Sequence, residues 1–181
     1  MSKRHLELLW LMPATVIATP AYATDYLSVE QAQKALFPDA SEFISQPVKL
    51  SDEQKDKVTK EAGVRQRKNE QPAWRVQKDG KHVGWFVVDE VIGKHEYITY
   101  AIAIAPEGRV LGVEVMSYRE THGGQVRDVN WRKRFNGKTL SDPFKLDVDV
   151  PNISGATLSC RNILDGVKRV LILHKIALAN G

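Results

Sequence analysis

The chain has 181 residues, of which 43% are hydrophobic and 27% are charged, as in an ordinary globular protein with one sizeable core. Its formal net charge is +4, and its lysines and arginines are spread along the chain, so we expect no nucleic-acid partner. Cys160 is the only cysteine, which excludes an intrachain disulfide. The histidines are scattered without metal-ligand spacing, so the sequence predicts no metal site.

Residues 1–23 have the pattern of an export signal. A basic start, MSKRH, precedes a short apolar stretch, and Ala21 and Ala23 form a small-residue cleavage site before Thr24. Pro13 breaks the apolar stretch, which is shorter than the roughly 20 residues that a membrane span needs. We therefore expect an exported, periplasmic protein. An uncleaved N-terminal anchor is the alternative.

Two helices are expected next, each with a recognisable start and end. Ser28 and Gln31 have the spacing of a capping box, and Pro38 ends the first helix. Ser51 is the expected N-cap of the second helix, which ends before Gly63. The charged residues of this second helix are expected to face solvent.

The polar stretch 64–74 is expected to be a loop, and from Trp74 onward the hydrophobic period changes to two. About four strand-like runs follow, separated by turns at Asp79-Gly80, at Gly93-Lys94 and at 106–108. Successive strands joined by such short turns form a hairpin-connected antiparallel meander.

The last third of the chain is expected to end in a long helix. A glycine-rich loop, a short helix near 128–135 and a turn around Gly137 come first, and 145–150 is a candidate strand. Apolar residues at helical spacing then predict a helix over 156–178. The sequence predicts an α+β fold, with helices packed on an antiparallel sheet.

The junction before this last helix reads Ser154-Gly155-Ala156-Thr157. The first N–H groups of a helix lack intrahelical partners and, with the helix dipole, form a site for a phosphate. Gly155 permits close backbone approach, and the Thr157 hydroxyl is placed to bind a phosphate or to be esterified by one. The alternative is that Ser154 simply caps the helix.

This junction resembles the motif (S/T)-G-A-(T/S)-x-(S/T) of the FMN-binding domain family, which it matches over residues 154–159. Members of that family include the C subunit of the sodium-pumping NADH:quinone oxidoreductase, the G subunit of the Rnf complex and small exported flavoproteins. The resemblance implies FMN joined through a phosphoester to Thr157 by a flavin transferase of the ApbE type. The chain departs from the family pattern at Pro151, where the family usually has Asp, and at His122, where it usually has Pro.

A second passage also resembles the family. It usually shows a Glu-Thr-x-Gly loop, then an aromatic residue and Phe-x-Gly-Lys, which correspond here to the loop 120–124, Trp131 and 135–138. Trp131 and Trp85 are each expected to be buried in the core, while stacking of one of them on the flavin ring is the alternative. The residues implied to bind FMN are Thr157, Ser154, Gly155, Ala156, Leu158, Ser159, Glu120, Thr121, Gly123 and Gly124.

The resemblance divides the chain into an FMN-binding domain at 80–181 and a helical segment with a loop at 24–79. No Gly-x-Gly-x-x-Gly fingerprint, nucleophile–base pair or paired carboxylates stand out in the sequence. We therefore expect an electron carrier rather than a stand-alone enzyme, with redox donor and acceptor proteins as partners. Membrane contact is expected only through partners or an uncleaved N-terminus. The alternatives are an anchored subunit of an ion-pumping redox complex and a flavin-free anion-binding module.

Overall fold

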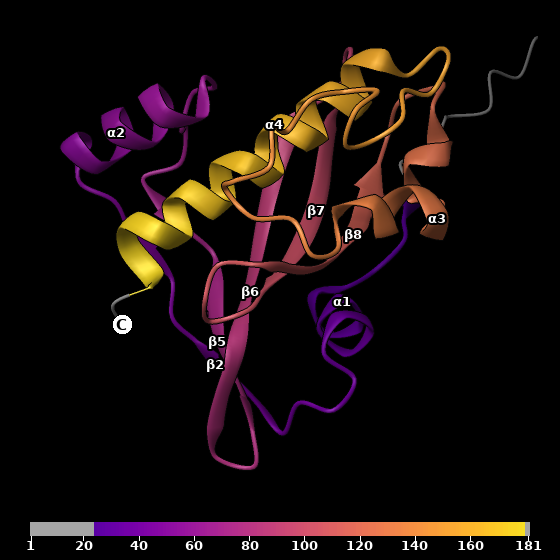
Figure 1. Cartoon of the computed structure of the whole chain (residues 1–181). Helices are drawn as coiled ribbons and strands as arrows, with labels where there is room; N and C mark the ends of the chain where they lie inside the picture. The colour runs from indigo at the N-terminus through magenta and orange to yellow at the C-terminus, as the bar shows by residue number, and fades with distance from the viewer. Residues whose placement is uncertain (1–23, 180–181) are drawn as a thin grey trace, which may run out of the picture.

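The computed structural model describes residues 24–179, which form an antiparallel sheet covered by helices (Figure 1). The order of the six strands in the sheet is β1-β8-β7-β6-β5-β2. The predicted α+β class is confirmed. The bounds of the sheet strands are Thr24–Asp25 for β1, Glu42–Ser45 for β2, Ala73–Lys78 for β5, Lys81–Ile92 for β6, Tyr97–Ile104 for β7 and Val110–Tyr118 for β8.

The centre of the sheet is the predicted meander. Strands β5 to β8 pair in sequence order, each antiparallel to the next. The β5–β6 turn has Asp79 at φ 51° and Gly80 at φ 74°, which is the left-handed pair that a two-residue hairpin turn requires. All three predicted turns fall between strands, so the meander is confirmed.

Within residues 24–179, four α-helices accompany the sheet: α1 Val29–Leu36, α2 Asp52–Ala62, α3 Val129–Arg132 and α4 Thr157–Leu173. Ser28 and Gln31 form the predicted capping box of α1. Ser51 caps α2, and Gly63 ends it in the left-handed conformation, as predicted. Short 3-10 turns flank α3, and a π-helical turn over His174–Leu178 extends α4, so the predicted short helix and long C-terminal helix are both present.

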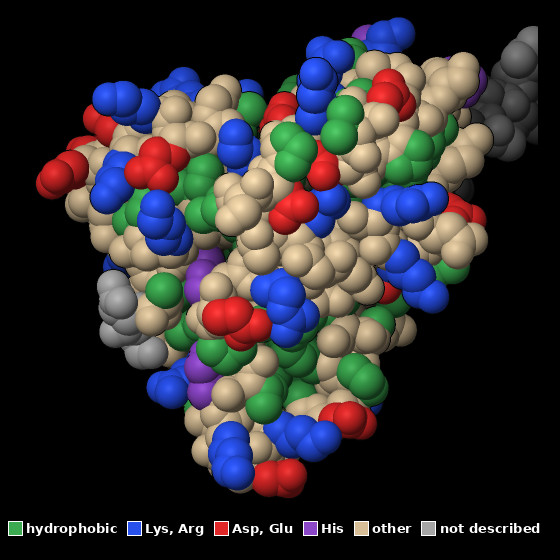
Figure 2. Space-filling model, viewed as in Figure 1, with side chains coloured by type: hydrophobic (Ala, Val, Ile, Leu, Met, Phe, Trp, Pro, Cys, Tyr) green, Lys and Arg blue, Asp and Glu red, His purple; other side chains and the backbone are tan. Residues whose placement is uncertain are grey.

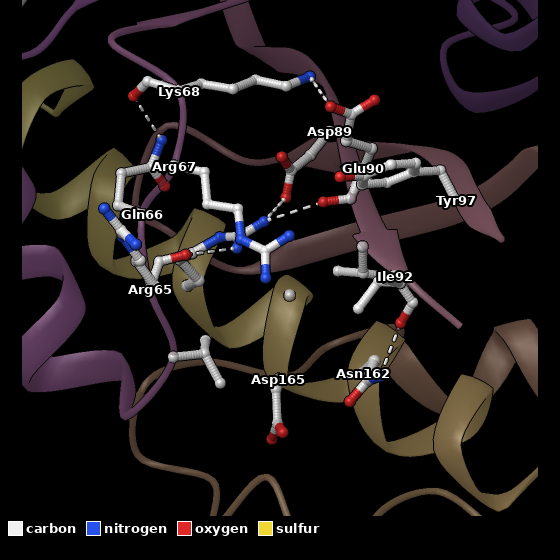
Figure 3. A pocket seen from close by; sticks show the side chains of 14 residues that line it. Arg65, Gln66, Arg67, Lys68, Asp89, Glu90, Ile92, Tyr97, Asn162 and Asp165 are labelled. Carbon is white, nitrogen blue, oxygen red and sulfur yellow. Dashed lines mark hydrogen bonds and ion pairs between the residues drawn. The ribbon is translucent and has the colours of Figure 1, made fainter. Parts of the chain in front are cut away.

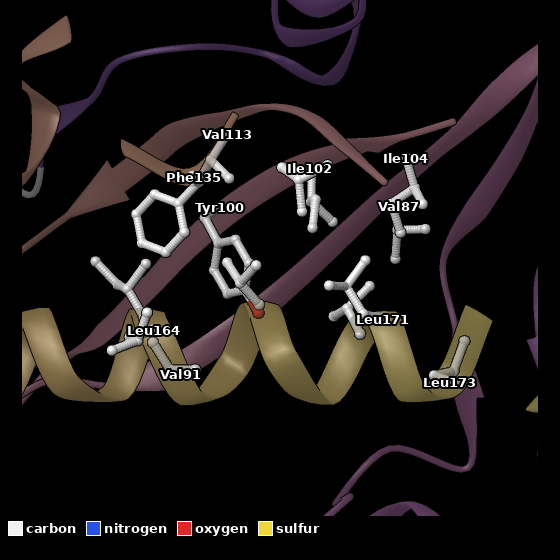
Figure 4. Close-up of a cluster of buried hydrophobic side chains, with 14 of the residues drawn as sticks. Val87, Val91, Tyr100, Ile102, Ile104, Val113, Phe135, Leu164, Leu171 and Leu173 are labelled. Atoms are coloured by element: carbon white, nitrogen blue, oxygen red, sulfur yellow. The ribbon is translucent and has the colours of Figure 1, made fainter. Parts of the chain in front are cut away.

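The two faces of the sheet are covered by different helices. Because side chains alternate along a strand, Tyr100, Ile102 and Ile104 of β7 face α4, and Figure 4 shows them packed toward Leu164 and Leu171 of that helix. The intervening residues Ala101 and Ala103 belong to a second, smaller core beneath α1. The main core therefore lies between the sheet and α4, and it fixes where the N-terminus of α4 stands.

Four strands, β1 to β4, were not expected from the sequence. Strand β2 pairs with β5, and β3 Val48–Lys49 pairs with β4 Glu70–Gln71, so the stretch 24–79 contains strands as well as helices. The prediction of a loop over 64–74 is wrong for the C-terminal part of this stretch, which contains β4 and the start of β5. These strands are short, and their pairing partners lie far away in the sequence.

The strand expected at 145–150 is also wrong. Asp149 accepts hydrogen bonds from the backbone N–H of Lys145 and from Nζ of Lys138, and Asp147 has a left-handed φ of 64°. These contacts close the segment into turns, with a single bridge between Leu146 and Val150.

Two predictions are not tested by this fold. The export signal at 1–23 lies outside the described residues, and the domain limits remain predictions. Within 24–179, the helices are too short or too polar to cross a bilayer. Figure 2 shows Lys and Arg side chains interspersed with Asp and Glu over the face in view, without a large basic patch.

Candidate functional site

Two turns that are distant in the sequence meet at one end of the sheet. One follows β8 and the other precedes α4, and two adjoining cavities of about 760 and 450 Å³ lie against them. Thr121, His122 and Gly155 line both cavities. The structure thereby brings together all ten residues that the sequence singled out: Ser154, Gly155, Ala156, Thr157, Leu158, Ser159, Glu120, Thr121, Gly123 and Gly124.

The start of α4 carries no side-chain cap within the described part of the chain. Ala156 occupies the N-cap position, so the alternative that Ser154 caps the helix is wrong. The Ala156 N–H donates to the carbonyl of Ile153, and the first helical hydrogen bond runs from Cys160 N–H to Ala156 O. The N–H groups of Thr157, Leu158 and Ser159 therefore have no acceptor inside the helix and remain available to an anion.

The three residues of the first helical turn face different surroundings. Thr157 is half-buried and lines the 450 Å³ cavity at the start of the helix. Leu158 is exposed, with 45% of its surface accessible, whereas Ser159 is buried at 3%. Of the two hydroxyl residues in this turn, Thr157 is therefore the more accessible to solvent.

Tyr118, the last residue of β8, is a site residue that the sequence analysis missed. Its hydroxyl donates to the carbonyl of His122 at 2.5 Å and lies 3.2 Å from Oγ of Ser159. Burial raises the pKa of Tyr118, so the hydroxyl keeps its proton at neutral pH. Tyr118 therefore ties the loop after β8 to the first turn of α4. The available signal was an aromatic residue two positions before the Glu-Thr-x-Gly loop.

Glu120 supports the site through the backbone. Its carboxylate accepts hydrogen bonds from the N–H of His95 at 2.6 Å and of Glu96 at 3.0 Å. Burial alone would raise the pKa of Glu120, but these bonds and one from Lys94 lower it overall. The carboxylate joins the β6–β7 turn to the loop 120–124. Nearby, the Arg127 guanidinium stacks on the ring of Tyr26.

Neither tryptophan stacks in the site. Trp85 and Trp131 are buried, at 1% and 5% exposure, and neither lines the two cavities. Trp131 Nε1 donates to the carbonyl of Pro151, and both tryptophans pack in the main hydrophobic core, as expected. Cys160 is fully buried, and burial raises its pKa, which makes it an inert packing residue.

Two contacts hold the segment that leads into the Ser-Gly-Ala-Thr turn. Pro151 occupies the position where the family usually has Asp, and its carbonyl serves as the acceptor for Trp131. Asp149, two residues earlier, is held by Lys138 of the Phe-x-Gly-Lys passage at 2.6 Å. Lys138 therefore anchors the segment that leads into the Ser-Gly-Ala-Thr turn.

Comparison with known proteins relates the C-terminal part of the chain to a protein family. Residues 93–172 match the family model of the FMN-binding domain. Over 85 residues the chain is 36% identical to the G subunit of the ion-translocating oxidoreductase complex of Stutzerimonas stutzeri, covering 41% of this chain and 37% of that protein. The chain thus spans little more than a third of the length of this curated relative. Residues 93–172 thus resemble an FMN-binding domain, and these similarities imply FMN as the cofactor.

Two solved structures share the fold. The crystal structure of NqrC from Shewanella oneidensis has a TM-score of 0.51 and 26% identity, over 61% of this chain and 59% of that one. The C subunit of the Na⁺-translocating NADH-quinone reductase from Parabacteroides distasonis also has a TM-score of 0.51, over 74% of this chain and 77% of that one. Its identity of 15% supports similarity of fold alone.

The residues present fit FMN. The uncapped start of α4 offers N–H donors to a phosphate, and Arg127 and Lys94 each line one of the two cavities. The cavities adjoin at Gly155, whose φ of 80° turns the chain away and leaves no atom within 4 Å of where a Cβ would stand. A phosphate at the helix start and a ring system beside the 120–124 loop are therefore both accommodated. Among residues 24–179, His, Cys, Asp and Glu form no cluster suited to a metal ion.

Proposed function

We propose that this chain, with its FMN-binding domain at 93–172, is an exported electron carrier in which a phosphoester joins FMN to Thr157 Oγ1. One observation carries the proposal. Thr157 is partly exposed and is the first residue of α4, a helix whose start is capped by no side chain among the described residues. It lines the same cavity as Glu120 and Thr121 of the 120–124 loop. The flavin supplies reversible electron transfer when bound.

The residues around Thr157 have distinct tasks in this proposal. The N–H groups of Leu158 and Ser159 bind the phosphate, because they point along the helix axis without partners. Thr121, exposed at the rim of both cavities, hydrogen-bonds the polar part of the cofactor. Glu120 positions the β6–β7 turn and does not itself carry a proton to the flavin, since its carboxylate is occupied by backbone N–H groups.

An electron carrier fits the site better than an enzyme with its own substrate. Within 24–179, no serine, threonine or cysteine side chain is hydrogen-bonded to a histidine or lysine side chain, so the site lacks an activated nucleophile. The cavities also lie open on the surface at the end of the sheet. A covalent tether keeps the flavin in place outside the cytoplasm, where a lost cofactor is not readily replaced.

A fluorescence gel tests the covalent bond. The chain is exported in cells with and without an ApbE-type flavin transferase, which we propose as its modifying partner, and the denatured protein is viewed under ultraviolet light. We expect a fluorescent band, and a mass increase equal to one FMN less one water, only with the transferase. Thr157→Val removes both, because it keeps the shape and loses the hydroxyl.

Two matched variants sharpen this test. Thr157→Ser retains the band, because it keeps a hydroxyl at the same position, and Ser45→Ala retains it because this exposed serine of β2 lines neither cavity. A fluorescent band in Thr157→Val would contradict the proposal. A dark wild-type protein, with the transferase active on a control substrate, would instead favour a flavin-free module that binds an anion at the helix start.

An anchored subunit of a membrane redox complex is the second candidate function. It is favoured by the name of the relative at 36% identity, which is the G subunit of an ion-translocating oxidoreductase complex. The two functions differ in the fate of residues 1–23. N-terminal sequencing of the mature protein distinguishes them. A sequence that begins at Thr24 supports the exported carrier, whereas an intact N-terminus in the membrane fraction supports the anchored form.

A further inference from the structure

A third cavity, of about 350 Å³, lies apart from the two at the proposed flavin site. It is enclosed by the segment 64–68, the end of β6, the start of β7 and the middle of α4, and Figure 3 shows the side chains that line it. It shares no lining residue with the two flavin cavities. Asn162, its lining residue nearest to Thr157 along α4, stands five positions further on, or about 7.5 Å along the helix axis.

The floor of this cavity is a preorganised polar network. Arg169 is 8% exposed and pairs with the buried Asp89 at 2.5 Å, and Tyr100 donates to the same carboxylate at 2.7 Å. Arg169 also donates to the carbonyls of Arg65 and Glu90, so both the guanidinium and the 64–68 segment are held in place. A floor fixed in this way is typical of a binding site that is formed before its ligand arrives.

The hydrogen bonds within the described part of the chain leave two buried polar atoms of the lining residues unpaired. Nε of Arg169 and Oε1 of Gln66 have no hydrogen-bond partner among the described residues. Unpaired buried polar atoms are rare in folded proteins and call for a partner. One is a donor and the other an acceptor, so a bound molecule that carries both kinds of group, or a water it holds, satisfies them.

The walls of the cavity are apolar. Val64, Val91 and Ile92 lie along it, and the ring of Tyr97 stands at the rim, where 51% of its surface is exposed. Ile92 is also exposed, at 40%. An apolar or aromatic body of a small ligand would cover surface here that the chain leaves in water.

The charged residues that line the cavity indicate the charge of the ligand. Lys68 is paired with Glu90 at 3.4 Å, which Figure 3 shows across the cavity, and Arg169 is paired with Asp89. The exposed cations Arg65 and Arg67 form no ion pair within 24–179, and Asp165 is the one carboxylate of the lining that remains to oppose them. The lining therefore keeps one positive charge in excess.

We propose that this cavity is a second ligand site, which binds a small organic monoanion, such as a carboxylate, with an apolar or aromatic body. The anionic group lies toward Arg65 and Arg67, and the body lies against Ile92 and Tyr97. The site is independent of the flavin, because none of its residues borders the flavin cavities.

A titration with three matched probes tests this site. Benzoate, benzyl alcohol and benzylamine share a ring and differ in charge, and each is added at constant ionic strength to the isotope-labelled exported protein with its flavin. We expect benzoate to shift the backbone amide signals of 64–68, 89–92 and 162–169 in a saturable way. Benzyl alcohol binds at least about fivefold more weakly, and benzylamine does not saturate, because the excess charge of the lining is positive.

Variants separate charge from fold. The double variant Arg65→Gln/Arg67→Gln weakens benzoate binding at least about fivefold and leaves benzyl alcohol binding unchanged. The matched control Lys57→Gln/Lys60→Gln removes two exposed cations of α2 that do not line the cavity, and it leaves both affinities unchanged. Absence of saturable shifts with benzoate up to its solubility limit overturns the site. Equal affinity for all three probes overturns the assignment of an anion.

Discussion

Gly123 and Ala156 stand in direct contact, although they belong to turns on opposite sides of a long intervening segment. A Cβ atom on Gly123 would lie 2.2 Å from Cβ of Ala156 and 2.6 Å from the hydroxyl of Tyr118. Gly123 also has a left-handed φ of 89°. The glycine of one family motif and the alanine of the other are therefore small because they touch each other, and this contact closes the back of the proposed flavin site.

Gly123→Ala is expected to lower the free energy of unfolding by about 2–4 kcal/mol, because the new methyl group overlaps Ala156 and the backbone is strained at positive φ. Urea denaturation measures the change. Gly124→Ala is the matched control, since nothing lies within 4 Å of its Cβ position and its φ is not left-handed, and it changes stability by less than about 1 kcal/mol. Equal losses in the two variants would contradict the packing argument.

Tyr118→Phe tests the tie between the loop and α4. Loss of the hydroxyl leaves the carbonyl of His122 and Oγ of the buried Ser159 without this partner, so we expect a loss of about 1–3 kcal/mol in the free energy of unfolding. Amide hydrogen exchange should also become faster in the loop 120–124. Tyr97→Phe serves as control, because that side chain is exposed, and a comparable loss there would show that the Tyr118 hydroxyl has no special role.

Arg169→Met is expected to be among the most damaging single changes in the chain. It leaves the buried Asp89 carboxylate without its cation, which costs about 3–5 kcal/mol of stability in thermal or urea unfolding. Lys78→Met removes one partner of an exposed pair with Asp39 and costs less than about 1 kcal/mol. A small effect of Arg169→Met would mean that Asp89 becomes protonated or hydrated at little cost.

The buried His174 predicts a pH dependence of stability. Burial, and then the nearby His82, lower the pKa of His174 below its ordinary value of 6.5, while Glu107 acts weakly in the opposite direction. The unfolded chain therefore binds a proton at a higher pH than the folded chain does, and the free energy of unfolding falls as the pH drops below about 6.5.

Unfolding measured across this pH range checks the prediction. His174→Gln should make the decline below pH 6.5 shallower, because it removes the group whose pKa is lowered. His95→Gln changes an exposed histidine and should leave the slope as in the wild type. An unchanged slope in His174→Gln would assign the pH dependence to other groups.

Local features of the fold were predictable from the sequence. Ser28 and Ser51 mark helix starts because a cap acts on backbone groups two or three residues away. The turns of the meander and the face that α4 buries follow from hydrophobic periodicity, which is a property of a few neighbouring residues. The strand expected at 145–150 failed because the side chain of Asp149 binds Lys138, a contact that periodicity does not describe.

The sequence by itself determined the helices, the central meander and the ten residues that gather at one end of the sheet. Only the tertiary structure decided how these residues are held: Gly123 against Ala156, Tyr118 between the loop and α4, and Glu120 on the β6–β7 turn. It also revealed the cavity above Arg169 and Asp89. The physical reason is the separation of the interacting residues along the sequence. Helix caps and hydrophobic periodicity depend on residues a few positions apart, whereas packing and buried hydrogen bonds join segments that only the completed fold brings together.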